Sequence, residues 1–281
     1  MVIDLIGDGG GMTAVYGAGV ISALIEINNI MPRLRKAYAS SGASGTFAFC
    51  LAGQHYLKYK IWVESLCSES GFIDRRRIFS GNMLDLDHLE FVFREKVPLD
   101  IEALKKSKVE LYIAVTDYET GEGKYFTNRD DVDIIKVLKA SKAAPVVYNK
   151  PIIINGRRYI DGDISSSLEE KIDLALTQGA KKIIAIDNNY NLSKNNQLSR
   201  LNYIILTRYS KTMPEKLQKV IYSYLNKPNK QRNDSRVFYI RPSQILPIGM
   251  LDNNKEKLKL TMEMGYKDTA ENKKLRLFLD S

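Results

Sequence analysis

Short apolar runs alternate with helix-length segments along the first two-thirds of the chain. The runs are typical of buried strands and lie at Val2–Gly7, Ala37–Ser41, Val109–Val115, Lys182–Asp187 and Tyr203–Thr207. Helical segments are expected between them, at Ala14–Ile27, Val132–Lys142 and Leu168–Gln178, with Gly179 as the C-cap of the last one. This alternation predicts an α/β fold of three layers, in which helices cover both faces of a mostly parallel sheet.

Two features interrupt the alternation. Asn155-Gly156 lies between the apolar runs Ile152–Ile154 and Arg158–Ile160, which predicts a β-hairpin. Beyond Ser210 the pattern changes to a helix, a short strand at Val237–Ile240 and a long charged helix from about Asn254. Residues 188–201 and 227–235 are polar, as surface loops are. We therefore expect a main α/β unit over residues 1–209 and a mainly helical extension over residues 210–281, packed on the same domain.

Composition narrows the class of protein. The chain has 281 residues, 44% of them hydrophobic, which is ordinary for a globular protein with a full core. It contains no run of about 18 apolar residues, so we predict no membrane-spanning helix. The start MVIDLIGDGG has two acids and no basic leader, which argues against a secretory signal. These features favour a cytoplasmic protein.

The sulfur and imidazole side chains give little reason to expect a metal site. Cys50 and Cys67 have no metal-binding spacing and are expected to be buried free thiols. His55 and His88 are the only histidines, and both are expected to be structural or exposed.

The net charge of +9 is unevenly distributed along the chain. Residues 191–281 contain 18 basic and 8 acidic side chains, whereas residues 1–190 contain 24 basic and 25 acidic ones. Two interpretations remain open here: a solvated basic surface, or attraction to an anionic membrane face. No nucleic-acid-binding motif accompanies the charge, so nucleic acid is not an expected partner.

Small residues surround a serine where the second predicted strand turns into a helix. Gly42 precedes Ser44 by two positions and Gly45 follows it, as a strained nucleophile elbow requires. The second glycine of the usual G-x-S-x-G pattern is replaced by Thr46. A nucleophile elbow and a simple small-residue turn both fit this segment.

A nucleophilic serine needs a base, and the order of residues excludes the usual triad. No histidine follows His88, so the order Ser, Asp, His is absent. Asp161 is the best remaining candidate because it ends a predicted strand, just before Gly162. Strand ends are where α/β proteins build their sites. Burial, or repulsion from Asp163, would raise the pKa of Asp161 and make it a stronger base.

A glycine run follows the first predicted strand and precedes a helix. The backbone amides of Gly9, Gly10 and Gly11 would converge there, at a helix N-terminus, and could hold a phosphate or an oxyanion. A dinucleotide site would need an acidic residue at the end of the second strand. Ser40 and Ser41 lie there instead, which favours the oxyanion interpretation.

Three separated motifs together resemble the patatin-like phospholipases, and in particular a bacterial branch with a C-terminal extension. The motifs are similar to the family's oxyanion loop, nucleophile elbow and Asp-Gly motif, and they read Asp8-Gly9-Gly10-Gly11, Gly42-Ala43-Ser44-Gly45 and Asp161-Gly162-Asp163. The resemblance implies a patatin-like catalytic domain over residues 1–209. It also implies a lipid acyl hydrolase that acts on a phospholipid or another acyl ester without metal or cofactor.

The resemblance further implies the role of each site residue. Ser44 would attack the ester, Asp161 would accept its proton, and the amides of Gly10, Gly11 and Met12 would hold the oxyanion. Thr13, Thr46 and Asp163 depart from the family pattern. These departures motivate an alternative, a catalytically silent lipid- or partner-binding protein on the same fold. Either protein could contact an anionic membrane peripherally through the basic last third.

Overall fold

The structure is a computed structural model that describes residues 2–80, 82–188, 206–226 and 232–281. The described strands form one sheet in the order β5-β6-β3-β2-β1-β7-β8, with β4 paired to β3. The sheet's parallel part consists of β1 (Ile3–Gly7), β2 (Leu34–Ala39), β3 (Glu110–Asp117), β7 (Ile183–Ile186) and β8 (Val237–Ile240). The antiparallel strands are β4 (Gly123–Thr127), β5 (Ile152–Ile154) and β6 (Arg157–Asp161).

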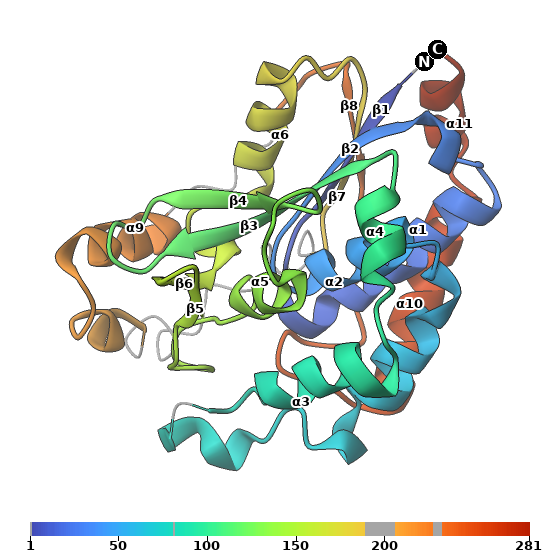
Figure 1. Cartoon of the computed structure of the whole chain (residues 1–281). Coiled ribbons are helices and arrows are strands. Elements are labelled where there is room, and N and C mark those ends of the chain that lie inside the picture. Colours follow the sequence, from blue (N-terminus) through green and yellow to red (C-terminus); the bar gives the residue numbers. More distant parts are fainter. Residues whose placement is uncertain (1, 81, 189–205, 227–231) are drawn as a thin grey trace.

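Side chains of the central strands alternate between two hydrophobic cores, one on each face of the sheet. Ile6 and Tyr38 pack against α6 (Leu168–Thr177), whereas Leu5 and Ala37 belong to the larger core on the opposite face. Helices that cover this opposite face are α1 (Val15–Glu26), α2 (Ser41–Leu51), α5 (Ile134–Ala140) and α10 (Lys255–Ala270). The fold is therefore a three-layer α/β/α architecture with a mostly parallel central sheet, as the alternation predicts (Figure 1).

Smaller elements complete the chain. They are α3 (Leu86–Phe91), α4 (Ile101–Lys106), α9 (Glu215–Asn226), α11 (Lys273–Asp280) and short 3₁₀ or π segments, one of which is Lys60–Ser65. No helix in the described residues is long and apolar enough to cross a membrane.

The last third of the chain packs closely on the first. Strand β8 extends the sheet beside β7, and α10 crosses α1 at a point where both helices carry glycine. A Cβ at Gly19 would lie 1.9 Å from the carbonyl oxygen of Met262, and one at Gly265 would lie 2.1 Å from that of Tyr16. Only glycine permits backbones to approach so closely.

The functional edge of the sheet is created where two strands meet end to end on one side of β3. Strand β4 occupies one edge of β3 from Tyr112 to Thr116, so β2 and β6 must share the other edge. Strand β2 runs parallel to β3 and ends with Ala39 opposite Ile113. Strand β6 runs antiparallel and ends with Asp161 opposite Val115. The carboxyl ends of β2 and β6 therefore face each other.

The structure confirms several sequence predictions. Asn155 and Gly156 have φ values of 48° and 76°, as the turn of the β5–β6 hairpin requires. Gly179, with φ 84°, lies just beyond α6, but the C-cap is Gln178 rather than Gly179. Strand β8 has the predicted bounds, and the long helix begins beside Asn254, whose side chain caps it.

Other predictions are wrong or fall outside the described residues. Strand β2 ends at Ala39 rather than at Ser41, and β4 was not predicted. For the expected strand Tyr203–Thr207, residues 203–205 lie outside the described residues and residues 206–207 are helical. Most of the polar loop at residues 188–201 and part of that at residues 227–235 also lie outside the described residues.

Candidate active site

A strained turn connects β2 to α2, and Ser41 lies at its centre. Ser40 is extended, but Ser41, the first residue of α2, has φ 44°. A non-glycine residue in this left-handed region costs on the order of 1 kcal/mol or more, so the surrounding contacts must hold it. The Ser41 N–H donates to Ser141 Oγ at 2.9 Å, and Ser141 in turn donates to the carbonyl of Ala114 at 2.7 Å.

The strained turn points the Ser41 hydroxyl at the carboxylate that ends β6. Ser41 Oγ donates to Asp161 Oδ2 at 2.9 Å. Both residues are almost fully buried, with exposed fractions of 7% and 4%. The backbone of Asp161 is fixed as well, because its N–H donates to the carbonyl of Ala143 at 3.1 Å. The arrangement is a hydroxyl and a carboxylate in direct contact, away from bulk water.

The structure does not bring Ser44 and Asp161 together, which corrects the predicted pairing. Ser44 lies one turn further along α2, where its Oγ donates to the carbonyl of Ser41 at 2.7 Å. The same oxygen accepts from Lys142 Nζ at 2.6 Å. Ser44 is fully buried and does not line the cavity described below, whereas Ser41 does. The cause is the early end of β2, which places the strained turn three residues before Ser44.

The environment of Asp161 favours its protonated form. Burial raises the pKa of Asp161, and the nearby carboxylate of Asp163 raises it further. The N–H of Asp163, the hydroxyl of Ser41 and the charge of Lys142 partly offset this effect. The net result is a carboxylate with a raised pKa, and therefore a stronger base than an exposed aspartate.

A buried charged cluster supports the site from the α6 side. Asp163 accepts a hydrogen bond from the hydroxyl of Ser40, and Lys171 Nζ lies 3.5 Å from its carboxylate. Lys171 is fully buried and also donates to Ser40 Oγ at 2.5 Å. The Asp163 carboxylate fills the space beside Gly9, where an added Cβ would come within 1.7 Å of it. Asp163 therefore connects the end of β6 to the glycine loop.

The predicted oxyanion loop lies next to the strained turn, but its amides are not equivalent. Gly10 and Gly11 have φ values of 114° and 59°, and among the described residues their N–H groups have no acceptor. The Met12 N–H, by contrast, donates to the carbonyl of Met250 at 3.0 Å. Met12 was expected to be an oxyanion donor, but its amide is already engaged.

Gly42 allows the glycine loop and the strained turn to pack against each other. A Cβ at Gly42 would lie 2.6 Å from the carbonyl oxygen of Gly11 and 2.6 Å from the Cβ of Ala14. The N–H of Gly42, which follows Ser41, has no acceptor among the described residues. Amides from both segments are therefore available beside the Ser41 hydroxyl. Gly45, the other predicted elbow glycine, instead accommodates the ring of Phe93.

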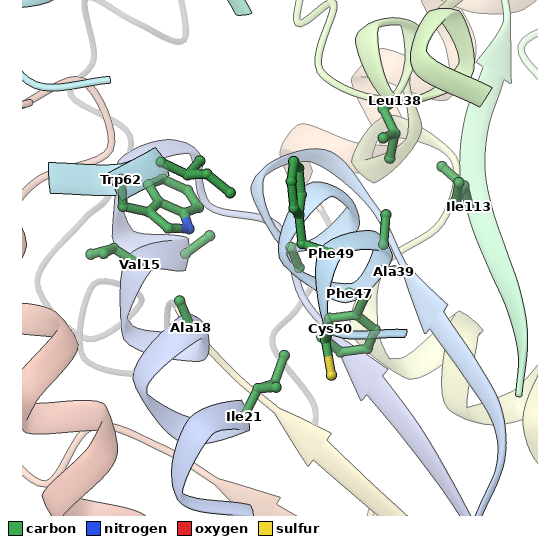
Figure 2. Packing of buried hydrophobic residues seen from close by; sticks show 14 of the residues in the cluster. Val15, Ala18, Ile21, Ala39, Phe47, Phe49, Cys50, Trp62, Ile113 and Leu138 are labelled. Atoms are coloured by element: carbon green, nitrogen blue, oxygen red, sulfur yellow. The ribbon is translucent and has the colours of Figure 1, made fainter. Parts of the chain in front are cut away.

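A cavity of about 320 Å³ extends from this site into the larger core. Gly10, Gly11, Ser41 and Asp161 line its polar end. The rest of its wall is mainly apolar and includes Ile21, Phe49, Trp62, Phe72, Leu86 and Phe93. Phe49 of α2, Trp62 of the segment Lys60–Ser65 and Ile21 of α1 are drawn in Figure 2. The volume and lining are those of a site for an apolar small molecule with one reactive polar end.

Thr13 and Thr46, which depart from the family pattern, both have structural partners. Thr13 Oγ1 donates to the carbonyl of Gly10 at 2.8 Å and so closes the glycine loop. Thr46 Oγ1 accepts from Trp62 Nε1 at 3.1 Å in the cavity wall. The two predicted structural histidines lie apart from Ser41: His88 Nε2 contacts the carbonyl of Ser65, and His55 lines the cavity beyond the end of α2.

The sequence did contain a signal for Ser41. Ala39, Gly42 and Ala43 are all small, and Ser41 lies in the turn just after the strand, as a nucleophile elbow requires. The glycine spacing favours Ser44 instead, because the apolar pattern predicts a strand that extends to Ser41. The partners Ser141 and Lys142 were not identified, since only the folded chain brings α5 beside α2.

Comparisons with known proteins agree with the family resemblance. The sequence model of the patatin-like phospholipases matches residues 5–171. The uncharacterized protein YjjU of Escherichia coli is 27% identical over 189 residues, covering 66% of this chain and 51% of that protein. The chain thus spans about half the length of this curated relative.

A solved structure shows the same fold at low sequence identity. VipD from Legionella pneumophila is 13% identical, with a TM-score of 0.52, over 99% of this chain and 67% of that one. The type III effector protein ExoU is 12% identical, with a TM-score of 0.38, over 95% of this chain and 52% of that one. Because the family's sequence model covers more than half of the chain, the chain belongs to the patatin-like phospholipase family.

Proposed function

We propose that this protein is a serine-dependent acyl-ester hydrolase in which Ser41 is the nucleophile and Asp161 the base. One observation carries the proposal: the Ser41 hydroxyl, held in a left-handed turn, donates to a buried carboxylate at the mouth of an apolar cavity. We do not assign the nucleophile to Ser44, because its hydroxyl is hydrogen-bonded to the Ser41 carbonyl and to Lys142 rather than to a carboxylate.

The proposed reaction has two steps with one shared base. Asp161 accepts the proton of Ser41 as Ser41 Oγ attacks the ester carbonyl, and the protonated Asp161 then gives this proton to the leaving alcohol. Water, activated by the same carboxylate, attacks the acyl-enzyme and releases a carboxylic acid. Amides of Gly10, Gly11 and Gly42 would stabilise the oxyanion in both steps, each contributing on the order of 10²-fold.

The cavity supports an ester with a long apolar acyl chain as substrate. Its polar end holds the reactive groups, while the wall along α2 and Trp62 can bury a chain. Burial of each methylene contributes about 0.8 kcal/mol, so longer chains should bind more tightly until the cavity is full. A phospholipid or a lysophospholipid is the expected natural class.

The test is hydrolysis of a series of acyl esters of increasing chain length. We expect kcat/KM to rise with chain length and activity to disappear in Ser41→Ala. A folded wild-type protein that hydrolyses no ester in the series would contradict the proposal. That result, combined with binding to lipid vesicles, would support the catalytically silent lipid-binding alternative.

Peripheral membrane contact is a separate part of the proposal. Helix α11 exposes Lys273, Lys274 and Arg276 together with Leu277, whose exposed fraction is 71%. Anionic vesicles should therefore bind the protein, and binding should weaken as salt rises. If the protein does not bind the vesicles, or if binding does not change with salt concentration, the basic residues of α11 do not attract an anionic membrane.

A further inference from the structure

Lys142 places a buried amine in the wall of the same cavity, and the proposed reaction gives it no role. Its exposed fraction is 9%, and it follows α5 in the chain. We propose that Lys142 is a positioning residue: it holds the nucleophile turn through Ser44 and places a positive charge beside the Asp161 carboxylate. This inference rests on the proposed function, because it assigns a role within the Ser41–Asp161 pair.

The first part of the inference follows from a chain of hydrogen bonds. Lys142 Nζ donates to Ser44 Oγ at 2.6 Å, and Ser44 Oγ donates to the carbonyl of Ser41 at 2.7 Å. The amine therefore orients the hydroxyl that holds the peptide group of the strained residue. Since the φ of Ser41 is 44°, contacts on this peptide group help to keep the turn in place.

The backbone places Lys142 near Asp161 without a direct ion pair: the next residue, Ala143, accepts a hydrogen bond from the N–H of Asp161 at 3.1 Å, and Lys142 and Asp161 line the same cavity. Lys139, one turn earlier, contacts the carboxylates of Asp87 and Glu90. Within the described residues, no carboxylate oxygen lies within 4.0 Å of Lys142 Nζ, whose other partner is the carbonyl of Leu138 at 3.1 Å. An ammonium group has three N–H donors, so two contacts leave one donor free on a group that lines the cavity.

The charges around Lys142 come from the site itself. Burial lowers the pKa of Lys142, while Asp161 and Asp163 oppose this effect. Lys142 in turn favours the ionised form of Asp161, against burial and the charge of Asp163. The neighbouring titratable groups are Lys171 and Asp8, which adjoin Asp163, and the neutral hydroxyl of Tyr224 on α9, whose pKa is raised by burial and by these acids. Lys142 thus lies on the α2 side of the acidic pair, where its amine contacts Ser44.

Substitutions can separate the two effects. Lys142→Met removes the charge and the hydrogen bond, Lys142→Arg keeps a charge, and Ser44→Ala interrupts only the hydrogen-bond chain. Lys136→Met is the matched control, because it makes the same change at an exposed position on α5. The measurement is the pH dependence of kcat/KM with a water-soluble short-chain ester.

We expect the acidic limb of the profile to move to higher pH by about one unit in Lys142→Met, because an opposite charge nearby typically lowers the pKa of an aspartate by 1–3 units. Lys142→Arg should return the limb toward its wild-type position. Ser44→Ala should lower kcat without moving the limb, and Lys136→Met should change neither.

An unmoved limb in folded Lys142→Met would overturn the inference even if kcat fell, because a merely structural lysine would lower kcat at every pH. If Lys142→Met does not fold, Lys142→Gln takes its place, because glutamine keeps a hydrogen-bond donor for Ser44. The position of the acidic limb of its kcat/KM profile then supports or overturns the inference in the same way. The proposed function fails in a different way: wild type would show no hydrolysis, or Ser41→Ala would retain it.

Discussion

Ser41 and Ser44 begin the same helix, one turn apart, and glycine follows each of them. Their environments nevertheless differ. Ser41 is held in a left-handed conformation, faces a carboxylate and lines a cavity. Ser44 has a partner for its proton in the helix backbone and receives a hydrogen bond from Lys142. Small neighbours are thus common to both serines, whereas strain and a facing carboxylate distinguish the one that we propose as nucleophile.

The largest expected effect is the difference between the two serines. Ser41→Ala should lower kcat by on the order of 10⁶-fold, because it removes the atom that would form the acyl-enzyme. Ser44→Ala leaves that atom in place and should cost less than about tenfold, through loss of a hydrogen bond of about 1 kcal/mol. Initial rates on one acyl ester measure both. Equal losses of kcat in Ser41→Ala and Ser44→Ala would contradict the assignment of the nucleophile to Ser41.

Replacement of the base should have the next largest effect. Asp161→Asn keeps the shape of the side chain but cannot accept the Ser41 proton, so kcat should fall by on the order of 10⁴-fold. The same reaction rates measure this change, with Asp173→Asn on the exposed side of α6 as a control for the loss of one carboxylate. If Asp161→Asn retains more than a tenth of the wild-type activity, Asp161 is not the base.

The same variant should be more stable than wild type near neutral pH. The folded-state pKa of Asp161 is raised to about 8, compared with roughly 3.9 in an unfolded chain. Between these values the folded state binds more protons, so stability contributed by Asp161 at low pH is lost as pH rises. Asp161→Asn should abolish this loss. Melting temperatures at pH 4 and pH 7 should therefore differ less in the variant, and an equal dependence would contradict the raised pKa.

Contact between the two loops should produce an intermediate effect. Gly42→Ala places a methyl group against the Gly11 carbonyl and Ala14, so the oxyanion amides must shift. We expect kcat to fall by about 10²-fold, the usual cost of one oxyanion donor, with little change in KM. Gly249→Ala, where an added Cβ meets open space and φ is not positive, as at Gly42, controls for the general cost of replacing a glycine. A Gly42→Ala protein with full activity would show that this contact is unimportant.

The smallest expected effect is on the strain itself. Ser41→Gly relieves the left-handed conformation, which should add about 1 kcal/mol to the free energy of unfolding relative to Ser41→Ala. Urea denaturation of the two inactive variants measures this difference. The reverse order of stability would mean that Ser41 is not strained in solution.

The fold was more predictable than the site because the strands with buried side chains carry a clear hydrophobic pattern. Val109–Val115 and Val237–Ile240 are examples of such runs. Strand β4 was missed because only Phe126 within it is buried. The hydrophobic pattern places strand β2 too late because its first half contains Arg35 and Lys36, whose charges are paired in the fold with Asp4 and Glu110.

The site was partly predictable, since the motif segments are local but their partners are not. Asp161 ends a strand and the glycine loop follows one, and the sequence predicts both as site segments from that position. The contact of Ser41 with Asp161 depends on β2 and β6 sharing one edge of β3, which no local pattern reveals. The engagement of Met12 by Met250 depends on the return of the C-terminal segment to the loop.

The most direct test of the central claim is to locate a covalent adduct. The wild-type protein would be treated with a fluorophosphonate, and the modified residue identified by peptide mass spectrometry within residues 34–51. We predict a single adduct on Ser41, absent in Ser41→Ala and retained in Ser44→Ala. An adduct on Ser44, or none on the folded wild-type protein, would contradict the account.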